Sequence, residues 1–202
     1  MQSVSDKILA RIHRKRRGVA ISGKDFLDLA SRASVDKALS ALAKAGQIRR
    51  VSRGVYDYPR VSAELGGELS PDYDQVAHAI ARSNGVRIEA SGAWAANLLG
   101  LSTQVPAKIV YLTNGTSRTL QVGNQTIAFE RVSPKELRAK PGTSSLVVQA
   151  LRYLGKEHVD EGTVRHLQER LSPAEQRALI RDARYTADWI FEVLKRIASS
   201  AG

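Results

Sequence analysis

The stretch from Ser34 to Pro59 most constrains how this chain can fold, because an apolar helix pattern runs there directly into a small basic hairpin. Apolar residues recur at the i, i+3, i+4 and i+7 spacing of an α-helix, and Gly46 follows where a C-terminal cap is expected. A Ser-Arg-Gly turn signal then separates two short β-branched and aromatic runs, which predicts a hairpin over residues 47–59. The stretch therefore predicts a helix followed immediately by a hairpin.

The residues before this stretch supply the other elements of a known arrangement. Residues 3–17 have helical spacing, residues 19–21 form a short β-like run, and residues 22–30 again have helical spacing. A brief break at residues 31–33 precedes the helix that we expect to begin at Ser34. The order of helix, strand, helix, break, helix and hairpin is that of a winged helix-turn-helix, in which the second of the paired helices reads DNA.

The helix that we expect from Ser34 to Gly46 has one side without bulky side chains. At about 100° per residue, Lys37, Ser40 and Lys44 lie opposite the apolar stripe, together with Ala33. Small side chains allow a helix to approach the major groove closely, and lysines supply donors for phosphates and base edges. A simple solvated face would have the same composition, so the order of the elements, more than this face alone, favours DNA binding.

Arginines cluster in the predicted hairpin. Such charges also protect sheet edges from aggregation, but after a pair of helices they are expected to form a wing that touches phosphates or the minor groove. Four consecutive cations also close the first helix, where one or two would balance the helix dipole. The DNA-binding residues that these patterns predict are Arg16, Arg17, Lys37, Ser40, Lys44, Arg49, Arg50 and Arg53.

The distribution of charge supports an anionic partner for the first part of the chain. Residues 1–60 hold 14 Lys and Arg against 5 Asp and Glu, a net charge of +9, out of +11 for the 202 residues. Residues 61–202 are nearly balanced at +2. Such asymmetry is typical of a chain that binds nucleic acid or an anionic membrane through one end.

The sequence predicts a connection at residues 61–69, rich in glycine and acidic residues, and a second domain over residues 70–202. Helix is expected from Ser70-Pro71 to about residue 82 and again from Thr143 onward. Strands are expected between these helical regions, with a hairpin at Gly123-Asn124. Ser133 and Ser172 each open a Ser-Pro-x-Glu capping box. The fold class is therefore α+β: an N-terminal winged helix-turn-helix and a small α/β domain that ends in a helical bundle.

The sequence offers little for catalysis or for membrane insertion. There is no cysteine, no apolar run of membrane-spanning length, no secretory signal, and no phosphate-binding loop, zinc-protease motif or nucleophile elbow. Asp72-Tyr73-Asp74 has the Asp-x-Asp form of a metal site, but it falls in the first turn of an expected helix, where acids stabilise the dipole. We expect a cytoplasmic protein that is not an enzyme, with no catalytic residues, metal or cofactor.

Two segments carry a resemblance to a known family. SGKDFLDLASRASVDKALSALAKAGQIRRVSRGVYDYP at residues 22–59 and ASGAWAANLLGLSTQVPAKIVYLTNG at residues 90–115 resemble the AbiEi-like antitoxins of type IV toxin–antitoxin systems and proteins of a related branch. The resemblance covers about residues 1–135 well and the remainder loosely. It implies an N-terminal winged helix that binds inverted repeats in its own promoter, and it adds Arg32 and Ser34 to the predicted DNA-binding residues. It also implies a C-terminal domain that counters a nucleotidyltransferase-type toxin without needing a stable complex with it.

Two other functions fit the same elements. One is a plain winged-helix transcriptional regulator whose C-terminal domain senses a ligand or dimerises. The other is an enzyme that acts on nucleic acid and uses the winged helix to locate it. For the antitoxin and autorepressor interpretation we expect double-stranded DNA as the partner. A homodimer or cooperative binding would use paired half-sites about 10 bp apart or a multiple of this.

Overall fold

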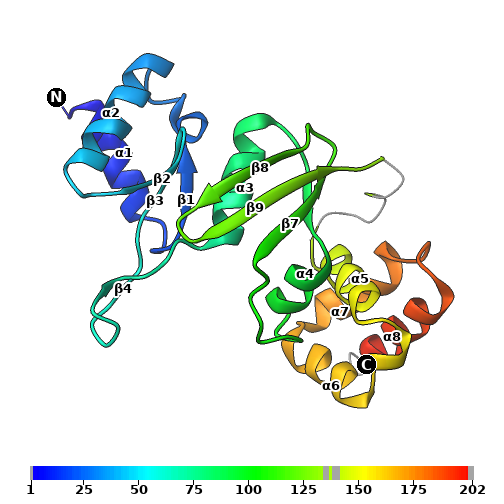
Figure 1. Cartoon of the computed structure of the whole chain (residues 1–202). Helices are drawn as coiled ribbons and strands as arrows, with labels where there is room; N and C mark the ends of the chain where they lie inside the picture. Colours follow the sequence, from blue (N-terminus) through cyan, green and yellow to red (C-terminus); the bar gives the residue numbers. More distant parts are fainter. Residues whose placement is uncertain (1, 134–136, 138–141, 200–202) are drawn as a thin grey trace. The chain divides into compact units, whose positions relative to one another are not determined.

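The computed structural model describes residues 2–133, 137 and 142–199, and it confirms the predicted mixture of helices and small sheets (Figure 1). Contacts divide the chain into two compact units. The first comprises Met1–Val86 with Leu120–Ile127, and the second comprises Arg87–Thr119 with Ala128–Gly202. None of the helices among the described residues combines the length and hydropathy that a bilayer span requires.

The first unit contains the predicted winged helix-turn-helix. Its three strands pair antiparallel in the order β1-β3-β2, with the hairpin strands beside the strand that follows the first helix. The elements, in chain order, are α1 (Val4–His13), β1 (Ala20–Ser22), the one-turn 3-10 helix η1 (Gly23–Phe26), α2 (Arg32–Lys44), β2 (Arg49–Ser52) and β3 (Val55–Asp57).

An apolar core holds this arrangement together. The helical stripe Val35, Ala38, Leu39 and Leu42 is buried, as predicted, and packs with apolar residues of α1, β1, η1 and β3. The core residues contributed by those other elements and by the approach to β2 are Ile8, Ile12, Ile21, Phe26, Ile48 and Tyr56. Burial of one face of α2 leaves the opposite face to solvent.

Two predicted helix boundaries and one predicted helix in this unit were wrong. The first helix ends at His13 and not at Arg17, so the cations after it lie in the connection to β1. Residues 22–30 form a single 3-10 turn followed by irregular turns, and not an α-helix. The break before α2 is shorter than residues 31–33, because the Ser31 side chain accepts a hydrogen bond from the Ser34 amide (3.4 Å) and caps the helix at Arg32.

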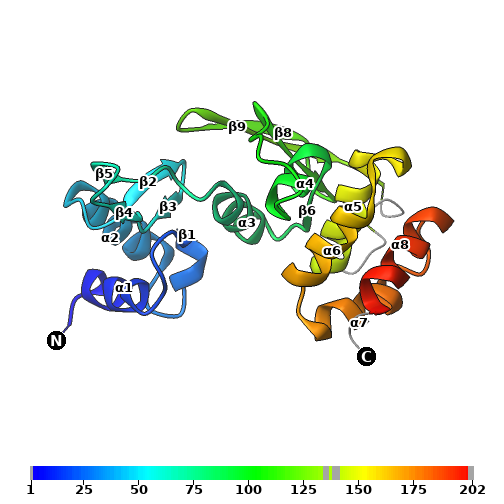
Figure 2. The ribbon, with the colours of Figure 1, turned by 90° about the horizontal axis from the view of Figure 1, so that it is seen from below.

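The helix α3 (Tyr73–Asn84) also belongs to the first unit. It packs against β1 and β3, and Figures 1 and 2 place the three-stranded sheet between α3 and the α1–α2 pair. The Arg82 guanidinium on α3 donates to the carbonyl oxygen of Ala20 (Nη2–O 3.1 Å) and pairs with Asp25 (Nε–Oδ1 3.5 Å). The winged helix is therefore backed by a further helix. The sequence predicted a winged-helix domain of residues 1–60, and the contacts group those residues with α3 in one compact unit.

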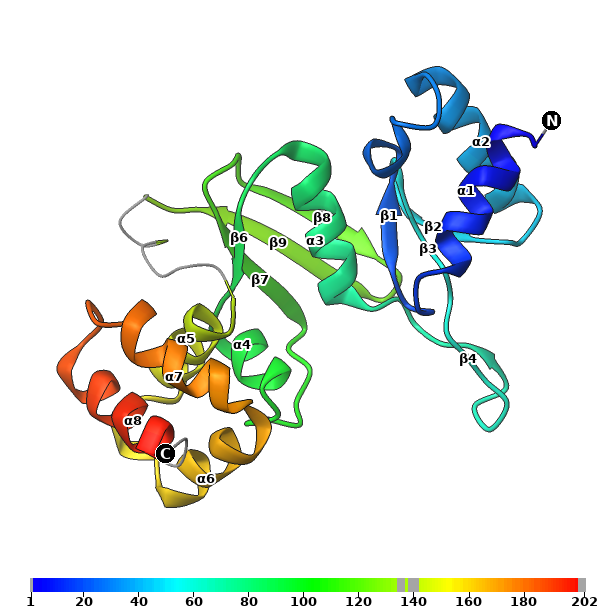
Figure 3. The same cartoon turned by 180° about the vertical axis from the view of Figure 1, so that it is seen from behind.

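Residues 61–72 differ in detail from the expected connection. They contain a short hairpin of β4 (Val61–Ser62) and β5 (Gly67–Glu68), seen as a projecting loop in Figure 3. The following helix begins at Tyr73 and not at Ser70-Pro71, because the Asp72 carboxylate accepts from the Gln75 amide (3.1 Å) and acts as its N-cap. Gly85, with φ of +67°, ends α3 in the left-handed conformation that glycine adopts at low cost.

The second unit is built on a sheet in the order β6-β7-β9-β8, whose hairpin tip at residues 120–127 groups with the first unit. Two hydrogen bonds join polar side chains inside this unit: the Trp94 indole donates to the Tyr111 hydroxyl (2.7 Å), and the Ser145 hydroxyl donates to buried Glu89. The predicted strands and the Gly123-Asn124 hairpin are confirmed. The elements are β6 (Ile88–Ala90), α4 (Gly92–Leu98), β7 (Lys108–Thr113), β8 (Arg118–Val122) and β9 (Gln125–Arg131).

Helices follow the sheet, as the sequence predicted. They are α5 (Thr143–Leu154), the short η2 (Lys156–His158), α6 (Glu161–Arg170), α7 (Pro173–Asp182) and α8 (Asp188–Ala198). The capping box at Ser172 is confirmed, since Glu175 accepts from the Ser172 amide (2.9 Å) and the Ser172 hydroxyl accepts from the Glu175 amide (3.4 Å). The box predicted at Ser133 includes residues 134–136, which lie outside the described residues.

Candidate nucleic-acid interface

The exposed face of α2 is the centre of the candidate interface. Lys37, Ser40 and Lys44 are exposed on it, with Ala33 and Ala41 between them. None of the three polar side chains has a hydrogen-bonding or ion-pairing partner within the part of the chain that the structure describes. The face thus presents two free ammonium groups and one free hydroxyl on a surface without bulky side chains, as a helix seated in the major groove requires.

Two other predicted residues lie in the first turn of α2 and are held by local bonds. Arg32 pairs with Asp36 one turn on (Nε–Oδ2 2.8 Å), and both side chains are about half exposed. The Ser34 hydroxyl lies 3.0 Å from that of Ser31 and takes part in the N-cap. A salt bridge at this exposure adds little stability, but it fixes the direction of the Arg32 guanidinium beside η1, where Asp36 also lies against Gly23.

The hairpin forms the predicted wing, and two of its three arginines are free. Arg53 is exposed at the turn beside Gly54, whose φ is +72°, and Arg50 is exposed on β2. Neither has a side-chain partner among the described residues. Between them β2 is irregular, because Arg50 faces Tyr56 and Ser52 faces Val55, which leaves Val51 as an extra residue.

Arg49, predicted as a third wing residue, is held inside the fold instead. Its guanidinium pairs with buried Asp57 (Nη2–Oδ2 2.6 Å), donates to the Leu69 carbonyl (3.0 Å) and lies 3.5 Å from a Glu68 oxygen. The hydrogen bond with Asp57 raises the pKa of Arg49 above its ordinary value. The charge of Arg49 is therefore used to neutralise a buried carboxylate, and the residue ties the base of the wing to β5.

The structure separates Arg16 and Arg17 from the wing turn that carries Arg53. They lie in the basic loop (residues 14–18) that joins α1 to β1. Strand registers set Ser22 beside Val55 at the wing-tip end of the sheet and Ala20 beside Asp57 at its base. The basic loop continues from that base, where the Gly18 amide donates to the Tyr58 carbonyl (2.6 Å), as can be followed in Figure 3. The sequence thus predicted one basic surface, and the structure contains two.

Three further cations near the basic loop were not among the predicted DNA-binding residues. Arg14 and Lys15 complete the basic loop. The Arg60 side chain lies against Gly18, since a Cβ atom built onto Gly18 would be 3.1 Å from the Arg60 Cδ. The run of four cations in the sequence already indicated Arg14 and Lys15. Arg60 could not be linked to them from the sequence, because the contact joins residues 42 positions apart.

The groups considered for metal chemistry have structural partners. Asp72 is the N-cap of α3, and Asp74 lies 3.6 Å from His78 one turn later. His166 bonds the Leu99 carbonyl oxygen (2.8 Å). Within the described ranges, no three His, Cys, Asp or Glu side chains are grouped as a metal site would need.

Comparison with known proteins gives a family and no function. No curated protein matches the chain. A family model does match, and its description is a family of unknown function, DUF6088. The match runs from residue 7 to residue 179, so it spans α1, the winged helix, the sheet of the second unit and the helices up to α7. The chain therefore belongs to the DUF6088 family.

Proposed function

We propose that this protein is a sequence-specific DNA-binding protein that reads duplex DNA with α2 and holds it with the wing. The observation that carries the proposal is the exposed α2 face, where Lys37, Ser40 and Lys44 have no partner among the described residues. Arg53 and Arg50 on the adjoining hairpin supply phosphate contacts. The predicted target makes the cytoplasm the expected compartment.

The experiment is protection of the DNA upstream of the protein's own coding sequence from cleavage. The wild-type chain is expected to protect two half-sites about 10 bp apart, or a multiple of this, if two copies bind together. Lys37→Ala should lose the protection. Lys7→Ala is a matched control because Lys7 is exposed on α1 and has no side-chain partner among the described residues. Equal protection by both variants would contradict the proposed reading helix.

The resemblance to AbiEi-like antitoxins supports a finer proposal. The protein represses its own promoter and counters a nucleotidyltransferase-type toxin through the second unit, without a stable complex. A role for the second unit apart from DNA binding is supported by the position of the excess charge, because residues 1–60 carry +9 of the chain's net charge of +11 and contacts group the second unit separately.

A double variant separates the two activities. Lys37→Ala combined with Arg53→Ala should abolish promoter repression and still restore growth when the neighbouring toxin gene is expressed. Its thermal melt must first match that of the wild type. A folded variant that neither represses nor restores growth would favour the alternative, a transcriptional regulator that acts only at the promoter.

A further inference from the structure

The basic loop is the most concentrated positive surface that the first unit holds outside the α2 face and the wing. Arg14, Lys15 and Arg16 are exposed, and none has a hydrogen-bonding or ion-pairing side-chain partner within the described residues. Arg17 and Arg60 lie beside them. Five cations thus gather where α1 passes into β1. Balancing the dipole of α1 needs only one or two of them.

The loop is fixed in place by contacts at its end. The Arg17 guanidinium donates to the Pro59 carbonyl (2.9 Å) and lies 4.4 Å from the centre of the Tyr58 ring. The Gly18 amide bonds the Tyr58 carbonyl, and the Tyr58 amide bonds Val19 in return (3.0 Å). Arg17 therefore anchors the loop, while the three preceding cations remain available to a ligand.

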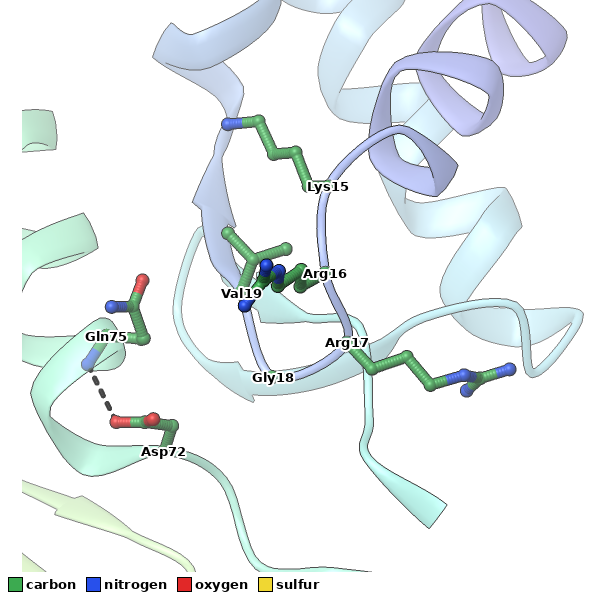
Figure 4. A pocket seen from close by; sticks show the side chains of 7 residues that line it. All are labelled: Lys15, Arg16, Arg17, Gly18, Val19, Asp72 and Gln75. Carbon is green, nitrogen blue, oxygen red and sulfur yellow. Dashed lines mark hydrogen bonds between the residues drawn. The ribbon is translucent and has the colours of Figure 1, made fainter.

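A pocket of about 430 Å³ lies beside the loop, with residues 15–19 on one wall and Asp72 and Gln75 on the other (Figure 4). The side chains of Lys15 and Arg17 point in different directions, so they do not converge on one small anion. The Asp72 carboxylate opposes an anion inside the pocket. Cations spread along a loop match a ligand with several phosphates in a row, as in a nucleic-acid backbone.

The loop faces a different side of the first unit from the α2 face. It extends from the base of the sheet, whereas the wing turn lies at the other end of the same strands. Its pocket is completed by α3, which lies across the sheet from α2 (Figure 2). A duplex seated on α2 and the wing tip leaves this loop free.

We propose that the basic loop is a second, sequence-independent binding site for the backbone of duplex DNA. It allows one protein to hold two DNA segments at once. The inference rests on the proposed function only in assigning the first segment to α2. Arg14, Lys15 and Arg16 contact phosphates of the second segment, and Arg17 positions them.

The test uses the full chain and two duplexes of unrelated sequence, one fixed to beads and one fluorescent. The wild type should retain the fluorescent duplex on the beads. The triple variant Arg14→Ala, Lys15→Ala and Arg16→Ala should lose retention at least tenfold and keep the protection pattern of a single operator. The salt dependence of retention should fall by two to three units of slope, at about 0.9 per lost phosphate contact.

The matched control removes three other exposed cations that have no side-chain partner in the described part of the chain, and it gives the same change in net charge. They are Arg152, Arg165 and Arg177. Equal loss of retention in both triple variants would overturn the site and leave a net-charge effect. Retention unchanged in the loop variant would also overturn it. So would displacement of the second duplex by millimolar inorganic phosphate, or a loop effect seen only on phosphatidylglycerol vesicles.

Failure of the proposed function gives a different result. If Lys37→Ala keeps operator protection while the loop variant loses retention, the reading helix is wrong and the loop site stands. If Lys37→Ala loses protection and the loop variant behaves as wild type, the reading helix stands and the loop site is wrong.

Discussion

Arg49 and Asp57 face each other across β2 and β3, joined by two bonds of 3.0 and 2.6 Å between guanidinium and carboxylate. The Asp57 side chain is only 1% exposed, so this carboxylate depends on Arg49 for its neutralisation. An arginine that the sequence assigned to DNA is therefore part of the frame of the wing.

Removing Arg49 should destabilise the protein more than it changes DNA contacts. Arg49→Ala leaves a buried carboxylate without its partner and should lower the free energy of unfolding by about 2–4 kcal/mol. Arg50→Ala, one residue on, should change it by less than about 0.5 kcal/mol and weaken DNA binding. Urea unfolding of both variants checks this, and equal stability of the two would refute the assignment of Arg49.

A bulky acid on the α2 face should abolish DNA binding without unfolding the protein. Ser40→Glu places a negative charge against phosphates at an exposed position, so the far-ultraviolet circular dichroism and the melting temperature should stay those of the wild type. Ser40→Ala is the control and should bind nearly as well. Loss of helical signal in Ser40→Glu would show that residue 40 is not where the structure places it.

Arg53→Ala tests the wing tip. Loss of one phosphate contact should weaken binding to all duplex sequences alike and reduce the slope of log K against log salt by about one unit. Lys7→Ala should leave the slope unchanged. A change in sequence preference at constant slope would instead make Arg53 a reader of base edges.

The packing of α3 on β1 and β3 predicts how the chain can be shortened. A fragment of residues 1–60 uncovers the side of the sheet that α3 covers and loses the Arg82 bond to Ala20. It should melt without a cooperative transition, whereas residues 1–86 should show one. Differential scanning calorimetry of the two fragments distinguishes them, and a sharp transition in the shorter one would make α3 dispensable.

The cap of α7 gives the protein a dependence on acid. Hydrogen bonds from Thr143 and from Ser172 lower the pKa of Glu175 below its ordinary value of 4.5. The stabilisation is therefore complete above pH 4.5 and is lost as the pH falls through the lowered folded value. Glu175→Gln should be less stable than the wild type at pH 7 and converge with it in acid. Thermal melts of the two proteins across this pH range check the prediction, and a stability difference that stays constant with pH would contradict it.

The elements of the first unit were predictable because their signals are local. Three signals predicted these elements: the apolar stripe of α2, the glycine after it and the turn of the wing. The residues that make up each signal are close together in the sequence. The start of α2 was misplaced by two residues because Ser31 and Ser34 are both suitable caps, and their order along the chain does not say which one is used.

The roles of individual cations were harder to predict because they depend on distant partners. Arg49 finds its carboxylate on the neighbouring strand, and Arg17 finds Tyr58 and Pro59 more than forty residues later. The sequence shows that these residues are cationic. The tertiary fold decides whether each cation has a partner in the protein or is exposed to solvent. Lys37 and Arg53, which lie on regular exposed positions, were placed as predicted.

The grouping of residues 120–127 with the first unit has a consequence for synthesis of the protein. The ribosome completes residue 86 well before it reaches residue 127, and at about 5–20 residues per second the intervening segment takes roughly 2–8 s. During that interval the nascent winged helix, with α3, lacks the segment that completes its unit. The second unit is interrupted by the same segment, so neither unit has its full set of contacts until the β8–β9 hairpin has left the exit tunnel.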